Sequence, residues 1–547
     1  MPPHLVVAPL LIAFVTAVLT LFLRRVPRVQ RTASLMGALA YLGSVALLAK
    51  TVAARSILVY QISGWPAPFG ITLVADALSV FMLGLTAIVS LAAVVFSMRF
   101  MSEYAQRVSY HSLYHLMVVG ITGSFLTGDV FNLFVWFEVM LISSYVLVAF
   151  YSGPEHTRAA LQYTVLNLLG SAVMLLAIGG LYATTGTLNM ADMARRLGNP
   201  ERFGVDPVPV LGLAALLFCV FALKAGIVPF QFWVPAAYRA APAPVAAMLA
   251  GIVKKVGVYA IIRLYFTVFA AATLPEPLSL PGLTGTSFLD FFGPVMFVMA
   301  AASILLGGIG AVSRPDLDGL LAYSSISQIG FIVLPLAVAA TVPEVRALGI
   351  AATLIYTLNH GLAKSMLFLA SGTVQDAIGS LRFTDLGGLA QRTPILSASV
   401  FIGVLALIGI PPLSGFFAKL FVFRTTTNAS VLGGWGAVLA LLVALGGSIF
   451  TIAYVTRAWN RGFWGTQSEA VRTATYPPVL VTVVTGLAAL LLIVGIGFEP
   501  VLRVVEAAAE AALAREEYVN TVLSGVRGAD EVLAGSQTTL EPSQGTI

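Results

Sequence analysis

The sequence predicts an all-α protein that crosses a lipid bilayer about fourteen times. Hydrophobic residues make up 59% of its 547 residues, charged residues make up only 10%, and the mean hydropathy is +0.94. Apolar runs long enough to cross a hydrocarbon core of about 30 Å recur from one end of the chain to the other. No stretch between them could hold a globular domain, so the composition excludes a soluble catalytic module.

The apolar runs give the expected spans, and two of these spans are interrupted. The seventh contains Lys224-Ala-Gly-Ile-Val-Pro229 and the twelfth contains Gly409-Ile-Pro-Pro-Leu-Ser-Gly415. Proline removes a backbone donor and clashes with the preceding turn, so both helices are expected to kink or break. Broken backbone at membrane depth is tolerated only when it is buried in protein or lines a wet cavity. The expected spans cover residues 4–23, 33–52, 72–98, 110–127, 129–151, 161–184, 208–230, 242–266, 291–312, 319–340, 346–371, 395–423, 431–459 and 478–498.

The two broken helices, 7 and 12, lie five spans apart, which predicts two five-helix repeats. Units with an odd number of spans are inverted relative to each other, an arrangement that recurs in transporters with ion sites at discontinuous helices. Beyond the last span, the residues from Glu499 to about Val522 predict an interfacial helix, and residues 525–547 predict a flexible tail. The predicted units are three N-terminal spans in 1–109, the repeats 110–266 and 291–459, the last span 478–498 and the C-terminal region 499–547.

The placement of arginines predicts how the chain sits in the cell membrane. The net charge of +6 comes largely from arginines in short loops, which is typical of membrane topology and does not indicate nucleic-acid binding. Arginines follow the first apolar run and do not precede it, so we expect a retained span and not a cleaved signal peptide. When the spans are followed alternately, most loop arginines fall on one side of the membrane, which is expected to be the cytoplasmic side. The opposite side also has Arg195, Arg196 and Arg202. Both termini are expected outside. The arginines expected on the cytoplasmic side include Arg24, Arg25, Arg28, Arg31, Arg99, Arg107, Arg158, Arg239, Arg314, Arg382, Arg392, Arg457, Arg461 and Arg472.

The sequence predicts neither a cofactor nor a metal site. The single Cys219 lies inside an apolar run, so no disulfide framework and no cysteine-held redox centre can be built in this chain. His111 and His115 have the spacing of two ligands on one helix, but no third ligand is nearby in the sequence. Asp76 lies close to the end of a span and is expected to be structural.

Glu138 is the acid that makes the fifth span a functional candidate. It lies roughly 13 Å from Asp129 along a helix, which is near the middle of the bilayer. A carboxylate there costs at least a few kcal/mol unless a cation, a polar cavity or a proton compensates it. The candidate cations at similar depth are Lys224, Lys255, Lys364 and Lys419.

Lys224 is the expected partner of Glu138. At about 4 Å and an effective dielectric near 20, the two charges would attract by about 4 kcal/mol. A change in the distance between them could therefore load a proton onto the pair or release one. Two simpler interpretations remain: the lysine could extend to the interface, or the pair could be a static salt bridge. Its position before a proline break favours the functional interpretation.

The remaining candidates have the spacing of a proton relay. Lys254 and Lys255 point about 100° apart on a helix, so only one of them can face a given path, and we favour Lys255, which shares a face with Tyr259. Lys254 remains a possible interior partner. His360 and Lys364 also share a face, although His360 could instead be a hydrogen-bonded core residue. The expected wet lining is Ser324, Ser327, Gln328 and Tyr259.

The chain resembles the antiporter-like family, which comprises large subunits of Mrp-type sodium/proton antiporters and proton-pumping membrane subunits of respiratory NADH dehydrogenase. The resemblance covers nearly the whole chain, and it looks most like the D subunits of Mrp antiporters. Lys419 stands where one class of dehydrogenase subunit has a glutamate, and Ala-Ala-Tyr-Arg239 lacks the acid typical of the dehydrogenase versions. The motifs that carry the resemblance are Phe137-Glu-Val-Met-Leu-Ile-Ser-Ser-Tyr145, Lys224 with Pro229-Phe-Gln-Phe-Trp-Val-Pro235, Ala241-Pro-Ala-Pro244, Lys255-Val-Gly-Val-Tyr259 with Arg263, Tyr323–Gln328 and Asn359-His-Gly-Leu-Ala-Lys364.

The resemblance implies fourteen helices with inverted repeats, and functional roles for Glu138, Lys224, Lys255 and Lys419. It implies a secondary transporter subunit that works with other Mrp subunits, with H+ and Na+ as the transported ions and no cofactor. The alternatives are a proton-pumping subunit of a dehydrogenase or related hydrogenase complex, and a non-conducting scaffold. Four lysines at membrane depth are expensive for a scaffold.

Overall fold

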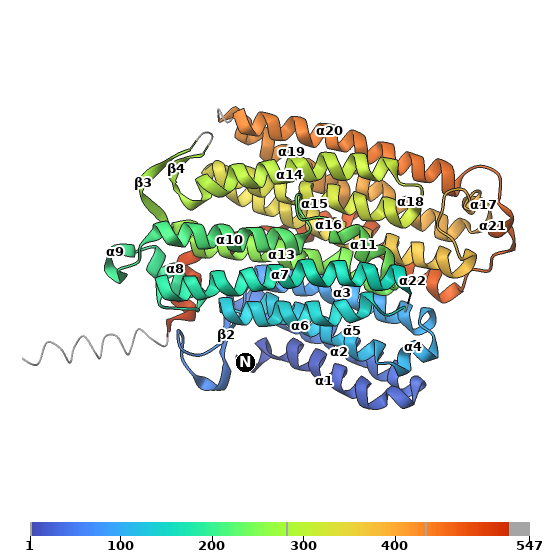
Figure 1. Ribbon diagram of the computed structural model, residues 1–547, viewed down its shortest axis with the longest axis horizontal. Helices are drawn as coiled ribbons and strands as arrows, with labels where there is room; N and C mark the ends of the chain where they lie inside the picture. Colours follow the sequence, from blue (N-terminus) through green and yellow to red (C-terminus); the bar gives the residue numbers. More distant parts are fainter. Residues whose placement is uncertain (1–2, 152, 281–282, 433–434, 525–547) are drawn as a thin grey trace, which may run out of the picture.

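The computed structural model describes residues 3–151, 153–280, 283–432 and 435–524, and its described part is a bundle of long helices that run side by side (Figure 1). The all-α class that the sequence predicts is therefore confirmed. Two small antiparallel hairpins lie at one end of the bundle, β1 with β2 and β3 with β4, with Leu58 opposite Ala75 and Thr273 opposite Ser287. The strands are β1 (Leu58–Gln61), β2 (Thr72–Ala75), β3 (Thr273–Leu280) and β4 (Leu283–Ser287).

The helices follow the apolar runs of the sequence. They are α1 (Ala8–Phe22), α2 (Pro27–Arg55), α3 (Ala77–Phe100), α4 (Glu103–Arg107), α5 (Tyr110–Leu126), α6 (Val130–Val148), α7 (Pro154–Thr185), α8 (Met190–Leu197), α9 (Pro200–Phe203), α10 (Pro207–Ala225), α11 (Trp233–Ala240), α12 (Ala243–Met248), α13 (Lys254–Ile261), α14 (Phe288–Ser313), α15 (Leu317–Thr341), α16 (Arg346–Ile378), α17 (Leu389–Arg392), α18 (Pro394–Ile408), α19 (Ser414–Val431), α20 (Trp435–Ala458), α21 (Glu469–Thr473), α22 (Pro478–Ile496), α23 (Phe498–Leu513) and α24 (Arg515–Val522). The π-helical turns η4 (Leu249–Val253) and η5 (Ile262–Val268) join α12 and α13 into one span, Ala243–Ala271.

Eleven helices in the described part of the chain are long and apolar enough to cross a membrane. The other three predicted spans fall on α5, α16 and the pair α18 and α19, where the chain is helical but short, more polar or broken. The total of fourteen spans, the division into units and the inverted repeats remain predictions.

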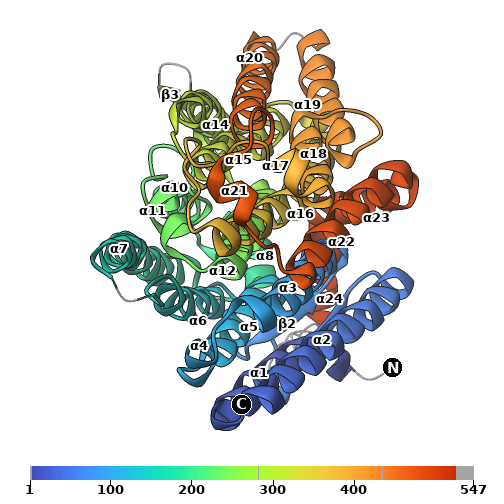
Figure 2. The same cartoon turned by 90° about the vertical axis from the view of Figure 1, so that its right-hand side faces the viewer.

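The centre of the bundle is the span Ala243–Ala271 together with α15 and α16. In the view along the bundle, α12, α15 and α16 lie inside a ring formed by the other long helices, with α1, α7 and α20 at the periphery (Figure 2). The apolar stretch of Ala243–Ala271 that could cross the membrane is completely buried, as is 94% of that of α15. A helix that is apolar and buried all round belongs to an interior, so its charged residues face protein and not lipid.

The seventh and twelfth predicted spans are broken where the sequence predicts. α10 ends at Ala225 before α11 begins at Trp233, and α18 ends at Ile408 before α19 begins at Ser414. Each first half-helix is followed by a glycine in the left-handed region, Gly226 with φ +66° and Gly409 with φ +93°. Residues with a Cβ avoid this region, which explains why glycine precedes the proline in both breaks.

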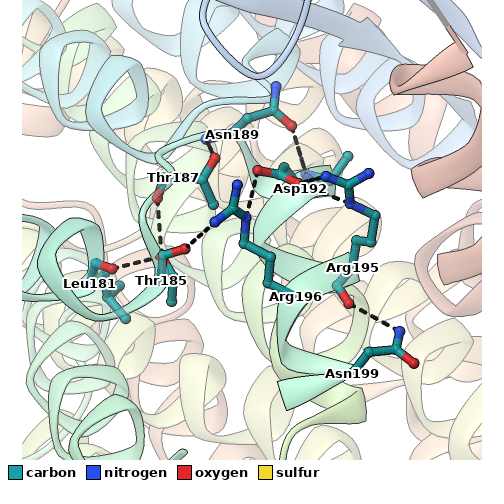
Figure 3. A network of polar contacts seen from close by, with 9 residues as sticks. Leu181, Thr185, Thr187, Asn189, Asp192, Arg195, Arg196 and Asn199 are labelled. Atoms are coloured by element: carbon teal, nitrogen blue, oxygen red, sulfur yellow. Dashed lines mark hydrogen bonds and ion pairs between the residues drawn. The ribbon is translucent and has the colours of Figure 1, made fainter. Parts of the chain in front are cut away.

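The end of the bundle that carries α8 holds two of the arginines that oppose the predicted charge bias. The carboxylate of Asp192, buried in α8, pairs with Arg195 at 2.7 Å and with Arg196 at 2.9 Å (Figure 3). Arg196 also donates to the carbonyl oxygen of Thr185 at the end of α7, at 3.0 Å. These two arginines therefore stabilise the loop after α7 through their contacts with Asp192 and Thr185. This structural role accounts for their position at the end of the bundle away from most other arginines.

The helix predicted after the last span is present as α23 and α24. α23 packs against α3 and α16, and the hydroxyl of Thr267 donates to the carbonyl oxygen of Ala512 at 2.7 Å. Arg515 donates to the carbonyl oxygen of Ala194 in α8 at 3.1 Å. The C-terminal helices therefore pack against the end of the bundle that carries α8. The flexible tail predicted for residues 525–547 lies outside the described residues.

Candidate functional site

Ser171 links Glu138 to Lys224. Its hydroxyl donates to Oε1 of Glu138 and accepts a hydrogen bond of 2.9 Å from Nζ of Lys224. Lys224 also donates to the carbonyl oxygen of Asn167, one turn earlier on α7, at 3.1 Å. The acid and the amine are therefore bridged by a hydroxyl, where the sequence predicted direct contact. A hydroxyl can accept a proton on one side while it donates its own on the other, so this bridge can pass a proton.

The break after Lys224 leads to Lys254. An added Cβ at Gly226 would lie 3.3 Å from Cε of Lys254, so the side chain of Lys254 passes beside the broken backbone. Nζ of Lys254 donates to the carbonyl oxygen of Ser325 in α15 at 3.0 Å. Lys254, which the sequence predicts only as a possible interior partner, thus lies between the first break and α15.

Lys255 points toward a different helix. Its Nζ lies 2.7 Å from Nδ1 of His360 in α16 and also donates to the carbonyl oxygen of Ala250. Both side chains are fully buried. The proton in the hydrogen bond between Nζ of Lys255 and Nδ1 of His360 is held by one nitrogen and accepted by the other, so either group can carry it.

Lys364 lies one turn beyond His360 on α16 and contacts α15. Its Nζ donates to the hydroxyl of Ser324 and, at 3.0 Å, to the carbonyl oxygen of Leu321. Ser324 is adjacent to Ser325, the contact of Lys254, so two lysines from different spans meet the same turn of α15.

Gln328 lies one turn further along α15 in a buried polar cluster. Its side-chain oxygen accepts from the hydroxyl of Tyr356 at 2.6 Å, and its nitrogen donates to Tyr454 at 3.1 Å and to Thr451 at 3.3 Å. These contacts connect α15 to α16 and α20.

Lys419 lies beside the second break. An added Cβ at Gly409 would lie 3.0 Å from Cδ of Lys419, and Nζ of Lys419 donates to the hydroxyl of Ser448 in α20 at 3.0 Å. The same nitrogen lies 5.4 Å from the ring centre of Phe331 in α15. At each break, therefore, the aliphatic part of a lysine side chain lies beside the glycine whose backbone is left-handed.

Two predicted lining residues have contacts away from the lysines. The hydroxyl of Ser327 donates to the carbonyl oxygen of Ile304 in α14 at 3.0 Å. Tyr259 donates to the carbonyl oxygen of Phe125 at 2.8 Å and lies 3.2 Å from the hydroxyl of Ser79. Close by, Asp76 caps α3 and forms a buried ion pair of 2.6 Å with Arg263.

Ser171, Tyr356 and Tyr454 were not predicted from the sequence. Asn167 and Ser171 stand four residues apart in an otherwise apolar stretch of α7, which would have indicated a polar face. The two tyrosines gave no such signal, because many buried tyrosines of this chain only pack.

Five of the six lysines of the sequence are buried in this arrangement. Only Lys224 has a carboxylate near it within the described residues, through Ser171, while the other four donate to carbonyls, hydroxyls and one imidazole. An unpaired buried cation is expensive, so these amines are suited to exchange protons and not to remain permanently charged.

Comparisons with known proteins identify the relatives of this chain. Residues 127–445 match the family described as NADH:quinone oxidoreductase/Mrp antiporter, TM. The D subunit of a Na+/H+ antiporter from Alkalihalophilus pseudofirmus is 33% identical over 95% of this chain and 99% of its own length. The N subunit of an NADH-quinone oxidoreductase from Desulforudis audaxviator is 36% identical over 85% of this chain and 86% of its own length.

Solved structures show the same fold. A chain of the Mrp complex from Dietzia sp. DQ12-45-1b superposes with a TM-score of 0.81 at 25% identity, covering 95% of this chain and 99% of that chain. A chain of an archaeal membrane-bound sulfane sulfur reductase superposes with a TM-score of 0.84 at 25% identity, covering 95% of this chain and 100% of that chain. The chain therefore belongs to the family of membrane subunits shared by NADH:quinone oxidoreductases and Mrp antiporters.

Proposed function

We propose that this chain is a subunit of a multisubunit Na+/H+ antiporter in the cell membrane and that it conducts protons. The identity to antiporter D subunits extends over 99% of their length, against 86% for the dehydrogenase N subunit. The observation that carries the proton role is the series of buried amines, joined by hydroxyls and an imidazole, that crosses the middle of the bundle.

The first step is exchange between Glu138 and Lys224. When Glu138 is ionised, the hydroxyl of Ser171 donates to it and accepts from the lysine ammonium, which favours a proton on Lys224. When Glu138 takes up a proton, that stabilisation is lost and Lys224 can release its own. The bridge therefore couples the charge of the acid to the proton occupancy of the amine.

The next steps cross the centre. From Lys224 a proton passes the break at Gly226 to Lys254, whose ammonium lies on the same turn of α15 as the Lys364 contact. Lys255 and His360 form a second proton-binding position between α13 and α16. The polar cluster around Gln328 leads toward α20, where Ser448 holds Lys419.

Broken helices give this path a means of connecting to different sides at different times. The helices end at Gly226 and Gly409, whose backbone is left-handed, and an added Cβ at either glycine would lie within 3.3 Å of a lysine side chain. A rearrangement at either break moves that lysine relative to its partner. Proton movement down the inward gradient is coupled in this way to cation expulsion by the complex.

A proton-pumping subunit of a redox-driven dehydrogenase or hydrogenase complex is the second candidate. The 36% identity to the N subunit from Desulforudis audaxviator favours it. The proteins that co-purify with the chain separate the two: iron–sulfur and flavin proteins indicate the redox complex, and small hydrophobic subunits indicate the antiporter.

The direct test is Na+-dependent proton exchange in everted membrane vesicles that contain the assembled complex. We expect Lys224→Ala to abolish exchange without loss of the assembled complex. Full exchange by an assembled Lys224→Ala complex would reject the proposed proton path.

A further inference from the structure

A large cavity opens at the arginine-rich end of the bundle. Its volume is about 790 Å³, and the residues that line it include Tyr238, Arg239, Arg314, Asp316, Asp318 and Arg382. The positive-inside rule puts this end in the cytoplasm. The cavity is therefore a cytoplasmic vestibule between the start of α15 and the end of α16.

Asp318 lies in the first turn of α15 and lines this vestibule. Its carboxylate accepts a hydrogen bond from the hydroxyl of Ser371 in α16. The charged side chains nearest to it are Asp316 and Arg239, which pair with each other at 3.4 Å. Within the described residues, Asp318 itself has no salt-bridge partner, so its carboxylate is available to exchange a proton with the vestibule.

A second, much smaller cavity is lined by Ser371, the partner of Asp318. Its volume is about 20 Å³, and it lies between α15, α16, α18 and α20. A water requires roughly 10–15 Å³ and two to four polar partners. The lining residues Ser371, Ser324 and Tyr454 supply hydroxyls, and most of the other walls are leucine and valine. The space is therefore large enough for one water.

The small cavity leads directly to the lysine series. Ser324, which lines it, accepts the hydrogen bond of Lys364. Ser371 and Lys364 are seven residues apart on α16, so they share a face about 10 Å apart. Tyr454, which also lines the cavity, bonds Gln328 of the polar cluster. Hydrogen-bonding groups thus follow one another from the vestibule to the buried amine.

We propose that Asp318 and Ser371 form the cytoplasmic proton-exchange site for Lys364, a role that rests on the proposed proton transport. A proton released by Lys364 passes through Ser324 and the small cavity to Ser371. The Ser371 oxygen takes up this proton, and its own hydroxyl proton moves to the Asp318 carboxylate. Asp318 then gives its proton to water in the vestibule and is again ionised, so the charge balances at each step. In the reverse direction the same groups load Lys364 from the cytoplasm.

Transport measurements on the whole complex test this site. In everted vesicles we expect Asp318→Asn to lower proton exchange at least about tenfold, as loss of a proton-transfer group generally does. Glu155→Gln, an exposed acid that lines the same vestibule, is the matched control and should retain exchange. Where Asp318→Asn does not assemble, Ser371→Ala decides, since it keeps the carboxylate but removes its link to the small cavity. An assembled variant with unchanged exchange would overturn the proposal.

Accessibility gives a readout independent of transport. In a Cys219→Ser background, a cysteine placed by Asp318→Cys should react with a membrane-impermeant charged thiol reagent in everted vesicles, which expose the cytoplasmic face. Thr86→Cys, at a buried position of α3, should not react. Absence of labelling at position 318 would overturn the proposal. If Lys224→Ala leaves exchange intact, the proton path itself fails; if Lys224→Ala abolishes exchange but Asp318→Asn does not, only the cytoplasmic site fails.

Discussion

Nζ of Lys255 lies 2.7 Å from Nδ1 of His360, with both side chains fully buried. Two basic groups in hydrogen-bonding contact cannot both be charged without strong repulsion, so the pair holds at most one extra proton at low cost. Such a pair exchanges a proton with little motion, because donor and acceptor are already in place. The other lysines donate to carbonyls and hydroxyls, so this contact is a distinct position in the series.

Replacing His360 by glutamine should slow proton exchange while the fold persists. Glutamine can still hydrogen-bond to Lys255 but cannot take up a proton, and loss of such a group costs about tenfold or more. Stopped-flow pH measurements on everted vesicles would measure the rate. His111→Gln is the control, since His111 is buried in α5 away from the lysines. Equal rates for the two variants would contradict a relay role for His360.

Replacing Glu138 by glutamine tests the acid that controls Lys224. The amide cannot accept a proton from Ser171, so we expect loss of Na+-dependent exchange in assembled complexes. Glu138→Asp keeps the carboxylate on a shorter side chain and should retain part of the activity. Full exchange by Glu138→Gln would show that the charge of this acid is not used.

Ser171→Ala tests the bridge itself. Removal of the hydroxyl leaves Lys224 with the carbonyl of Asn167 and separates it from Glu138, so exchange should fall at least severalfold, as expected for a broken transfer step. Ser143→Ala is the matched control, since its hydroxyl bonds only the carbonyl of Val139 in its own helix. If both variants transport equally, the proton does not pass through Ser171.

Much of this arrangement was predictable from residue types, because a few residues impose strong local constraints. The prolines after Gly226 and Gly409 forced breaks in two apolar runs, and the cost of charge in a bilayer marked Glu138 and the lysines. The bridge by Ser171 was not predictable, because it depends on how α7 packs against α6 and α10.

The choice between Lys254 and Lys255 illustrates a second limit. The two lysines are adjacent in the α-helix α13, so they point about 100° apart, and Lys254 contacts α15 while Lys255 contacts His360 of α16. The sequence could not show that each direction meets polar groups, because that depends on how α15 and α16 pack around α13.

The ion pair of Asp76 with Arg263 should matter for stability. Both side chains are buried, and removal of one partner from a buried pair costs about 3–5 kcal/mol. We expect Asp76→Asn to lower the thermal unfolding temperature of the complex in detergent. Glu499→Gln breaks an exposed pair with Arg503 and should cost no more than about 1 kcal/mol. Similar unfolding temperatures for the two variants would contradict the structural role of Asp76.

Gly226→Ala tests whether the first break itself is required for transport. The left-handed backbone at φ +66° disfavours alanine by about 1–2 kcal/mol, and its Cβ would lie 2.5 Å from Cγ2 of Val234 and 3.3 Å from Cε of Lys254. The turn must therefore move, and Lys254 with it, so exchange should fall in complexes that still assemble.

The control for this substitution lies earlier on the same helix. Gly212 is exposed in α10, with nothing within 4 Å of an added Cβ, so Gly212→Ala should leave exchange unchanged and stabilise the helix by up to about 1 kcal/mol. Exchange in everted vesicles and the amount of assembled complex would be measured for both variants. The alanine displaces the turn and therefore moves Lys254 away from its position beside the break. Normal exchange by an assembled Gly226→Ala complex would thus show that transport does not need this position of Lys254.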